Sequence, residues 1–203
     1  MSDTPRPAVG RPSATTAGEI ARVAVTLFAE RGYDAVTMED VAQAIGISRR
    51  SLFRYFATKA DLVWDGIDPA VDEFRRQLAD APTDIPVFDA FTAAYVAAIA
   101  PRSIELDLAR TRLRIIDAHP EVVPLASPRL NANADLLTEF LRARVPGIGD
   151  TVQLQAISQA ISACCFTALK YWATSTDDET PDETLRRALH SISSLGTLGE
   201  STT

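Results

Sequence analysis

The chain has 203 residues, of which 46% are hydrophobic and 23% charged, and its formal net charge is −7. This composition is ordinary for a globular protein with a buried core. We see no apolar run of the ~20 residues that a membrane span requires, and no apolar segment of a secretion signal at the N-terminus. The two cysteines, Cys164 and Cys165, are adjacent and form no disulfide framework, so we expect a reducing, cytoplasmic location.

The charge is unevenly distributed along the chain. Residues 1–60 hold eight Lys and Arg against six Asp and Glu, whereas residues 61–203 hold twelve against twenty-one. Four basic side chains lie in GISRRSLFRYFATKADL, residues 46–62, before its first acidic residue. A local basic segment in an acidic protein is typical of a chain that meets a polyanion through one surface.

The first sixty residues divide into an arm and three short helices. Residues 1–14 are rich in Pro, Ser, Thr and Ala and predict a flexible basic arm. A helical apolar period follows and ends near Gly32. Two more helices are expected to begin at Thr37 and Ser48, whose hydroxyls suit N-caps, with Gly46 as the turn between them. We therefore assign residues 15–60 to one small helical domain.

Residues 61–203 are expected to form a second, larger domain that is also helical. Sustained period-two alternation is absent from the sequence, so we predict an all-α chain. Asp68 and Pro69 form a helix-start signature within an otherwise continuous periodic segment, which predicts a break near residues 66–69. Further helices are expected at about 86–100, 102–118, 127–145, 151–174 and 181–195.

The order helix, glycine-containing turn, helix is the layout of a helix-turn-helix motif. Leu52 and Phe56 form the inner face of the third helix, so the remaining side chains near its start face outward, where a recognition helix meets base edges. These side chains are Arg49, Arg50, Ser51 and Tyr55. An arginine guanidinium matches the two major-groove acceptors of guanine. Phosphate oxygens suit the hydroxyls of Thr37, Ser48 and Tyr55 and the ammonium of Lys59.

The spacing alone leaves a second interpretation open. A solvated basic helix that packs on its neighbours without touching DNA has the same pattern, and such patterns arise often by chance.

The run LFAERGYDAVTMEDVAQAIGISRRSLFRYFATKADL strongly resembles the N-terminal DNA-binding domain of the TetR family of bacterial transcriptional regulators. The resemblance covers residues 18–64. Phe53 stands where the family often has a tyrosine that touches the DNA backbone, and phenylalanine cannot donate a hydrogen bond there. Gly10, Arg11 and Pro12 resemble the basic arm of some members, which implies that Arg11 reads an A·T tract in the minor groove. A disordered tail is the alternative for Arg11.

The resemblance also implies about nine helices, a homodimer and a C-terminal domain that binds a small effector. The last two helices of such proteins usually form the dimer interface. Here a stripe of small residues on helix 151–174 would allow close approach of a partner, together with apolar residues of the last helix. The predicted interface residues are Ala156, Ala160, Ala163, Thr167, Leu185, Leu189 and Ile192. The alternative is an ordinary buried core helix.

An effector pocket is expected among the fourth to eighth helices. The predicted lining residues are Trp64, Phe88, Phe91, Tyr95, Arg110, Leu113, Phe166 and Tyr171. Each apolar one could equally be plain core. Arg110 and Arg114 share a helix face that could bind an anion, although surface ion pairs with Asp107 and Asp117 are the interpretation we favour.

Within the family, RRSLFRYFATKADLVWDGID resembles regulators of the mycofactocin-system type, which are associated with acyl-CoA-like ligands. That likeness implies a small apolar effector such as an acyl-CoA, with its tail among Phe88, Phe91 and Phe166. Fatty acids, flavonoids and drug-like aromatic compounds are competing effectors.

No motif of an enzyme, metal site or cofactor site is present. The sequence lacks a nucleophile elbow, a Gly-rich phosphate loop and a zinc motif. His119 and His190 are isolated along the chain and have no metal-ligand spacing. A buried apolar role is expected for Cys164 and Cys165.

We therefore expect a cytoplasmic, homodimeric repressor that binds a palindromic DNA operator and is released by a small apolar effector, without metal or cofactor. A small-molecule binding or sequestering protein with a degenerate helix-turn-helix is the alternative, and Phe53 is the feature that favours it.

Overall fold

The computed structural model describes residues 15–65, 68–99, 103–124, 127–145, 147 and 151–195. All regular elements in these residues are helical, namely ten α-helices and one short 3-10 helix, which confirms the all-α prediction. The predicted arm, with Arg11, lies outside the described residues. The described residues hold one α-helix more than the nine or so expected, because the segment after residue 58 forms two helices.

That division falls where the sequence predicts a break. Helix α4 (Lys59–Trp64) ends at Asp65, whose extended backbone (φ −65°, ψ 145°) cannot continue a helix. Helix α5 (Asp68–Ala79) begins with the Asp-Pro pair. Proline is favoured in the first turn of a helix because its missing N–H would be unpaired there anyway.

Three short helices precede α4 and begin at hydroxyl N-caps. They are α1 (Ala17–Arg31), α2 (Met38–Ile45) and α3 (Arg49–Tyr55). The Thr37 oxygen accepts a hydrogen bond from the Asp40 backbone N–H (3.2 Å), and the Asp40 carboxylate accepts one from the Thr37 N–H (2.8 Å). These bonds to Thr37 lower the pKa of Asp40. The reciprocal pair satisfies two backbone donors that the first turn of α2 leaves open.

The turn between α2 and α3 depends on Gly46, which adopts a left-handed conformation (φ 76°). Its N–H donates to the Gln43 carbonyl (3.1 Å), and the next N–H, of Ile47, donates to the Ala42 carbonyl (3.0 Å). Such a C-cap suits glycine because other residues pay a steric penalty in this region. The turn therefore fixes the direction in which α3 leaves α2.

Lys59 ties the start of α4 to the loop between α1 and α2. Its ammonium donates hydrogen bonds to the backbone carbonyls of Tyr33 and Val36, the latter at 3.0 Å. The same nitrogen lies 4.1 Å from the centre of the Tyr33 ring. Partial burial lowers the pKa of Lys59. This side chain therefore has a structural role, whereas the sequence assigned it to a DNA phosphate.

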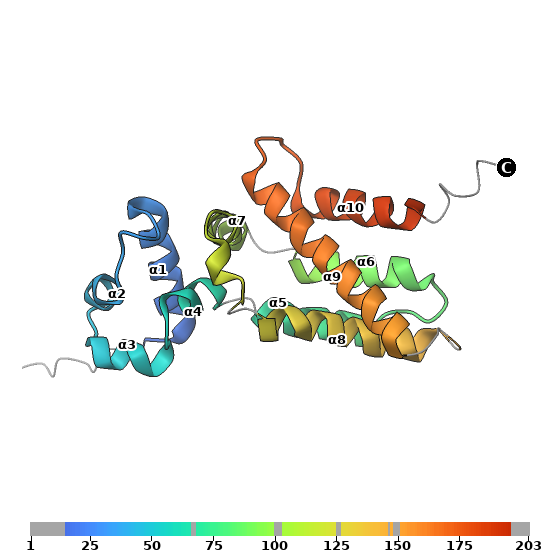
Figure 1. Ribbon diagram of the computed structural model, residues 1–203, viewed down its shortest axis with the longest axis horizontal. Coiled ribbons are helices and arrows are strands. Elements are labelled where there is room, and N and C mark those ends of the chain that lie inside the picture. Colours follow the sequence, from blue (N-terminus) through green and yellow to red (C-terminus); the bar gives the residue numbers. More distant parts are fainter. Residues whose placement is uncertain are drawn as a thin grey trace, which may run out of the picture.

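A second group of helices packs around its own core at the other end of the molecule (Figure 1). It consists of α5, α6 (Val87–Ile99), α8 (Ser127–Arg144), α9 (Thr151–Thr174) and α10 (Pro181–Leu195). Aromatic rings fill the space between α5 and α6: Phe74 lies 5.8 Å from Phe91 and 5.1 Å from Tyr95, measured between ring centres. The edge-to-face geometry of these pairs is the favoured one for aromatic rings.

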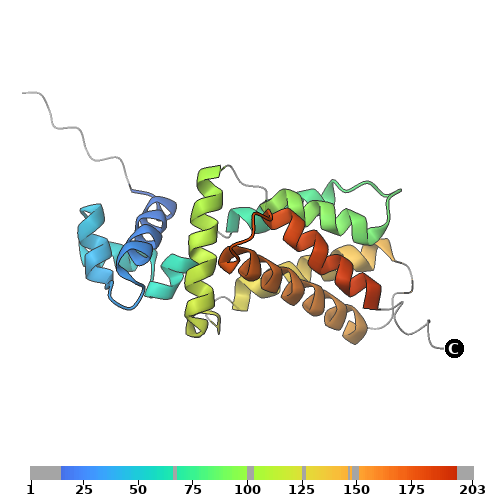
Figure 2. The ribbon, with the colours of Figure 1, turned by 90° about the horizontal axis from the view of Figure 1, so that it is seen from above.

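Helix α7 (Ser103–Ala118) stands between the two groups, as Figure 2 shows. It packs on α1 and α4 on one side and on α9 on the other. The core of α1–α4 continues into this helix and into η1 (Pro120–Val122), because Ile116 and Val122 belong to the same buried cluster. The indole N–H of the buried Trp64 donates to the Val122 carbonyl (2.8 Å). Helix α4 is thus joined to η1, the short helix that follows α7.

By length and composition, one helix among the described residues could cross a membrane: Val152–Thr174, within α9, has a hydropathy of 1.3. This segment was not predicted from the sequence, in which no apolar run of that length was expected. Core helices of soluble proteins meet the same criterion, and α9 packs against α7, α8 and α10.

Replacing Gly46 and Gly18 by alanine should change stability in opposite directions. At both positions an added Cβ meets no atom within 4 Å, so only the backbone differs. Gly46→Ala should lower the free energy of unfolding by about 1–2 kcal/mol, because alanine is strained at positive φ. Gly18→Ala, in the first turn of α1, should leave it unchanged or raise it by up to about 1 kcal/mol. Urea unfolding measures the free energy of unfolding of both variants. Equal changes in the two variants would contradict the role assigned to Gly46 in the turn.

The Lys59→Met variant should lose about 1–3 kcal/mol of unfolding free energy, because two carbonyls lose their donor. Lys170→Met is the matched control. Lys170 is partly exposed, pairs with Asp117 and lies 5.7 Å from the centre of the Phe166 ring, so its replacement should cost less than ~1 kcal/mol. Urea unfolding of both variants makes the comparison. A Lys59→Met protein as stable as the control variant would show that these bonds contribute nothing.

Candidate DNA interface and ligand cavity

Helix α3 presents a basic and aromatic face to solvent. Leu52 is fully buried and Phe56 nearly so, which places the other side of the helix outward as predicted. Phe53 and Tyr55 are each 42% exposed, an unusual exposure for large aromatic side chains that cover no part of the described core. The exposed basic residues of this face are Arg49, Arg50 and Arg54. The arrangement offers guanidinium groups and flat rings together, which suits the edge of a nucleic acid.

Arg49 is held only loosely within the protein. Its guanidinium lies 5.4 Å from the centre of the Phe53 ring, and its Nε is 4.0 Å from a carboxylate oxygen of Glu39. Both charged side chains are about two-thirds exposed, so the ion pair contributes little to stability. Breaking the ion pair with Glu39 to contact a DNA phosphate or base therefore costs Arg49 little free energy.

Two of the three hydroxyls predicted to meet phosphates, those of Thr37 and Ser48, lie at helix N-termini, whereas Tyr55 is the last residue of α3. Ser48 accepts from the Ser51 backbone N–H (3.1 Å), and the two serine hydroxyls lie 2.9 Å apart. Thr37 caps α2 in the same way. Backbone N–H groups at a helix start attract anions, so these positions combine a cap with a phosphate-binding geometry. Their contact with DNA stays a prediction.

A cavity of about 1050 Å³ lies where α7 meets the two groups of helices. Its wall includes side chains from α1, α4 to α9 and the segment after η1. Four of the residues predicted to line a pocket lie in it, namely Trp64, Tyr95, Leu113 and Phe166. The lining is mostly apolar, with a few polar groups, as is usual for a small-molecule site.

The other four predicted residues lie elsewhere. Phe91 is buried in the core beneath the cavity, and Phe88 packs against it with ring centres 6.5 Å apart. Tyr171 is half exposed on the outer side of α9. Arg110 lies with its guanidinium 4.5 Å from the centre of the Trp172 ring. Helical periodicity identifies these residues as apolar or basic, but which side of the helix faces the cavity is decided by tertiary packing.

The ion pairs favoured for α7 do not form as expected in the described part of the chain. Arg114 donates from Nε to the Ala173 carbonyl (2.6 Å), near the end of α9. Asp117 pairs instead with Lys170 (2.9 Å). These two contacts bind α7 to the C-terminal turns of α9. The first uses a carbonyl that the end of a helix leaves open, and the second is an ion pair in which Lys170 donates to Asp117.

Arg112 is the functional candidate that the sequence analysis passed over. It lies in the cavity wall, it is 8% exposed, and its Nε has no hydrogen-bond partner. Burial lowers its pKa, while the charge of Asp65, also in the wall, opposes that shift. The sequence contained a pattern that could have identified Arg112 as inward-facing. It falls at helical spacing between Leu108 and Ile116 on the apolar side of α7.

His119, expected to be isolated, lies beside two carboxylates. Its Nδ1 is 3.1 Å from an oxygen of Glu121 and 3.9 Å from one of Asp34, and its ring lies 4.7 Å from that of Tyr33. These three could hold a metal ion by distance, but both carboxylates are largely exposed. The contact joins the α1–α2 loop to the residues after α7.

The adjacent cysteines differ in environment. Cys165 is fully buried in the core, and this burial raises the pKa of its thiol. Cys164 is partly buried and lines a groove between α9 and α10.

Two family models match the chain. Residues 20–64 match the tetR family of bacterial regulatory proteins, and residues 85–195, more than half of the chain, match the MftR C-terminal domain. A candidate mycofactocin biosynthesis transcriptional regulator, MftR of Mycobacterium tuberculosis, is 29% identical over 164 residues, which cover 81% of this chain and 83% of the relative. The transcriptional repressor KstR2 of Rhodococcus jostii is 30% identical over 60% of this chain and 58% of its own length.

Solved structures show the same fold. The transcriptional repressor FadR of Thermus thermophilus, in complex with lauroyl-CoA, has a TM-score of 0.60 at 22% identity, with 86% of this chain and 92% of that chain covered. FadR of Bacillus halodurans, described as a fatty acid degradation regulator, has a TM-score of 0.63 at 17% identity, covering 89% and 95%. These proteins are regulators of transcription rather than enzymes. The present chain belongs to the tetR family of bacterial regulatory proteins, with a C-terminal domain of the MftR type.

Proposed function

We propose that this protein is a cytoplasmic, homodimeric repressor that binds a palindromic operator through α3 and is released by a small apolar effector in the cavity at α7. The observation that carries the proposal is the position of this cavity. Its wall includes Trp64 of the helix that follows α3, and it also includes residues of α5, α6, α8 and α9. A ligand there touches both groups of helices at once.

The exposed face of α3 supports operator recognition. Arg50 is fully available to solvent near the start of the helix, where side chains of a recognition helix reach base edges. Arg49 and Arg54 add positive charge on the same face. Tyr55 offers a hydroxyl to a phosphate, and the exposed Phe53 can pack on a thymine methyl group or on sugar. The loss of the tyrosine hydroxyl at position 53 thus leaves an apolar contact in its place.

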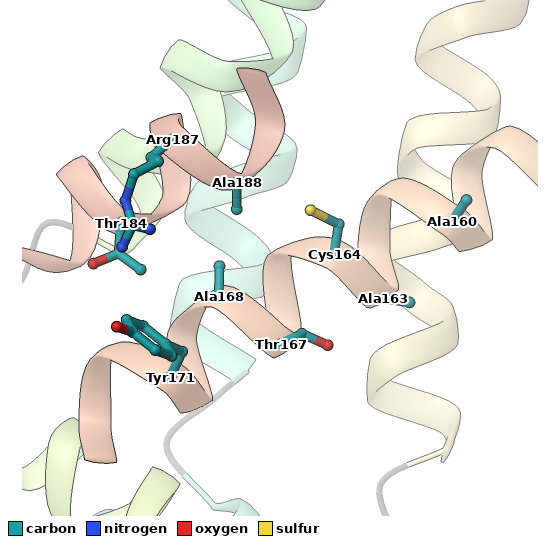
Figure 3. A pocket seen from close by; sticks show the side chains of 9 residues that line it. All are labelled: Ala160, Ala163, Cys164, Thr167, Ala168, Tyr171, Thr184, Arg187 and Ala188. Carbon is teal, nitrogen blue, oxygen red and sulfur yellow. The ribbon is translucent and has the colours of Figure 1, made fainter. Parts of the chain in front are cut away.

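The outer face of α9 supports a homodimer. Only 28% of its apolar stretch is buried within one chain. In Figure 3, Cys164 and Ala168 of α9 point toward α10 across an open groove of about 450 Å³, while Ala163 and Thr167 point away from α10. Four predicted interface residues are exposed on this face, namely Ala156, Ala160, Ala163 and Thr167. A second chain that covers them would remove apolar surface from water.

The predicted contribution of α10 is smaller than expected. Leu185 and Leu189 have no exposed surface and pack within the chain's own core, while Ile192 is partly buried. Contacts from α10 to a partner would come instead from exposed polar residues such as Arg187, which lines the groove.

The size and lining of the cavity support an effector with an acyl chain. At about 1050 Å³ it lies at the upper end of the roughly 300–1,000 Å³ typical of small-molecule sites. The Thermus FadR structure, which shares the fold, is a complex with lauroyl-CoA. An acyl-CoA or a similar acyl compound is therefore the first class to test. The effector must bind best to the conformer whose α3 helices fit the operator poorly, because only a difference in affinity shifts the equilibrium.

The direct test is fluorescence anisotropy with labelled DNA from the protein's own upstream region, with and without lauroyl-CoA or dodecanoate. Salt-dependent, sequence-specific binding that an acyl compound relieves supports the proposal. No specific binding at any salt concentration would instead favour a sequestering protein with a degenerate helix-turn-helix.

Arg50→Gln should weaken operator binding by about 1–3 kcal/mol and relax the base preference at one position of each half-site. Arg75→Gln removes the same charge from exposed α5 and should leave operator affinity within about twofold. Anisotropy titrations with a panel of single-base operator variants measure both effects. Identical behaviour of the two variants would remove Arg50 from the interface.

Ala160→Arg should convert the dimer to a monomer, because a long charged side chain would stand in the middle of the small-residue face. Ala79→Arg, on an exposed position of α5, is the matched control and should stay dimeric. Analytical ultracentrifugation gives the oligomeric state. A dimeric Ala160→Arg protein with wild-type dissociation constant would place the interface elsewhere.

A further inference from the structure

We propose that Arg112 binds the head group of the cavity's ligand, and that this ligand is an amphipathic monoanion of the carboxylate class. The inference rests on the proposed function only in taking the cavity as the effector site. It is testable without DNA.

Arg112 is a buried cation with one donor, its Nε, that has no partner. Its side chain is 92% removed from solvent, and its Nε is buried without a hydrogen-bond partner. A buried charge that lacks partners costs free energy, so a residue of this kind calls for an anion. A guanidinium presents two parallel N–H groups to the two oxygens of a carboxylate, and such charge-assisted pairs are the strongest hydrogen bonds in proteins. The cavity places open volume next to this group.

The charges around the cavity favour a single negative charge on the ligand. In the described wall, two basic side chains, Arg22 and Arg112, face two acidic ones, Asp65 and Glu73. Arg22 is exposed, which leaves Arg112 as the buried cation. Among the described wall residues, no cluster of cations could hold the several phosphates of a coenzyme A moiety inside the cavity, and the carboxylate of Asp65 would repel them. A free carboxylate needs only Arg112.

The remainder of the wall suits an alkyl chain. The aromatic rings of Phe74, Tyr95 and Phe166 lie in it, with Leu113 and Ile116 beside Arg112 on α7. Burial raises the pKa of Tyr95 well above its usual range, so its hydroxyl stays neutral. The wall thus has one charged end to hold a head group and an apolar region to hold a tail.

Asp65 connects this site to the DNA-binding helices. Its backbone N–H donates to the Asp61 carbonyl (2.9 Å), so Asp65 is the residue that ends α4. Asp65 lines the same cavity as Arg112. A carboxylate ligand in this cavity therefore meets the end of α4 at Asp65 and Trp64, whose indole is hydrogen-bonded to the Val122 carbonyl. Ligand binding then acts on the helix that follows α3.

The two tryptophans of the chain, Trp64 and Trp172, both line the cavity, so intrinsic fluorescence reports binding directly. The probes are dodecanoate, dodecanol and lauroyl-CoA, each below its micelle concentration. Dodecanol matches the tail of dodecanoate but carries no charge. We expect the wild-type protein to bind dodecanoate at least about tenfold more tightly than dodecanol, as a charge-assisted bond requires.

Arg112→Gln should abolish the preference for dodecanoate over dodecanol, whereas Arg112→Lys should keep part of it. Arg75→Gln, which removes an exposed charge outside the cavity wall, should leave the preference unchanged. Asp65→Asn should tighten dodecanoate binding several-fold and leave dodecanol unchanged, because a carboxylate of the cavity wall is gone. Thermal melts of all variants, and their binding of dodecanol, show whether each one is folded.

Three results would overturn the inference: an Arg112→Gln protein that still prefers dodecanoate, an Asp65→Asn protein that binds it more weakly, or wild-type protein that binds only lauroyl-CoA. Because no DNA is present, each can occur while operator binding is intact. Conversely, the protein could pass these tests and still bind no operator. The head-group site would then stand, and the proposed repressor function would be wrong.

Discussion

The hydrogen bond from the Trp64 indole to the Val122 carbonyl joins the end of α4 to η1, directly after α7, in a fully buried position. Around this bond the core of the first helices closes over Ile116, so α7 belongs structurally to the DNA-binding end of the molecule. On its other side the same helix is bound to α9 through Arg114 and Asp117. Any change in the packing of α7 must therefore move both ends or strain one of these contacts, which is the condition for coupling two sites.

The basic residues fall into three groups with different roles, within a chain that is acidic overall. Lys59 donates hydrogen bonds to carbonyls of the α1–α2 loop and so stabilises the three-helix core. The arginines of α3 are exposed and make only weak contacts, so they remain available to a polyanion. Arg112 is different again, since it is buried in the cavity wall and its Nε has no hydrogen-bond partner. Long-range attraction to DNA is thus confined to one surface, which also explains why the acidic body does not compete with it.

Local signals in the sequence predicted the local structure well, because capping and turn preferences act over a few residues. Thr37, Ser48 and Gly46 each occupy the position that their chemistry indicates, and the helix breaks at Asp68. Tertiary placement was harder. Periodicity shows that Leu185 and Leu189 share an apolar face, but not whether that face meets the chain's own core or a partner. Likewise the orientation of α7, which decides that Arg112 and not Arg110 faces the cavity, depends on packing against α4 and α9.

The coupling of the cavity to the operator is tested most directly by measuring dodecanoate affinity on the free protein and on the operator-bound protein. If the ligand acts through the α4–α7 junction, operator binding must weaken dodecanoate binding by the same factor by which dodecanoate weakens operator binding, because linkage is reciprocal. We expect that factor to lie between about 5 and 150, the usual range for coupled sites. Equal dodecanoate affinity with and without bound operator would show that the cavity and α3 are independent.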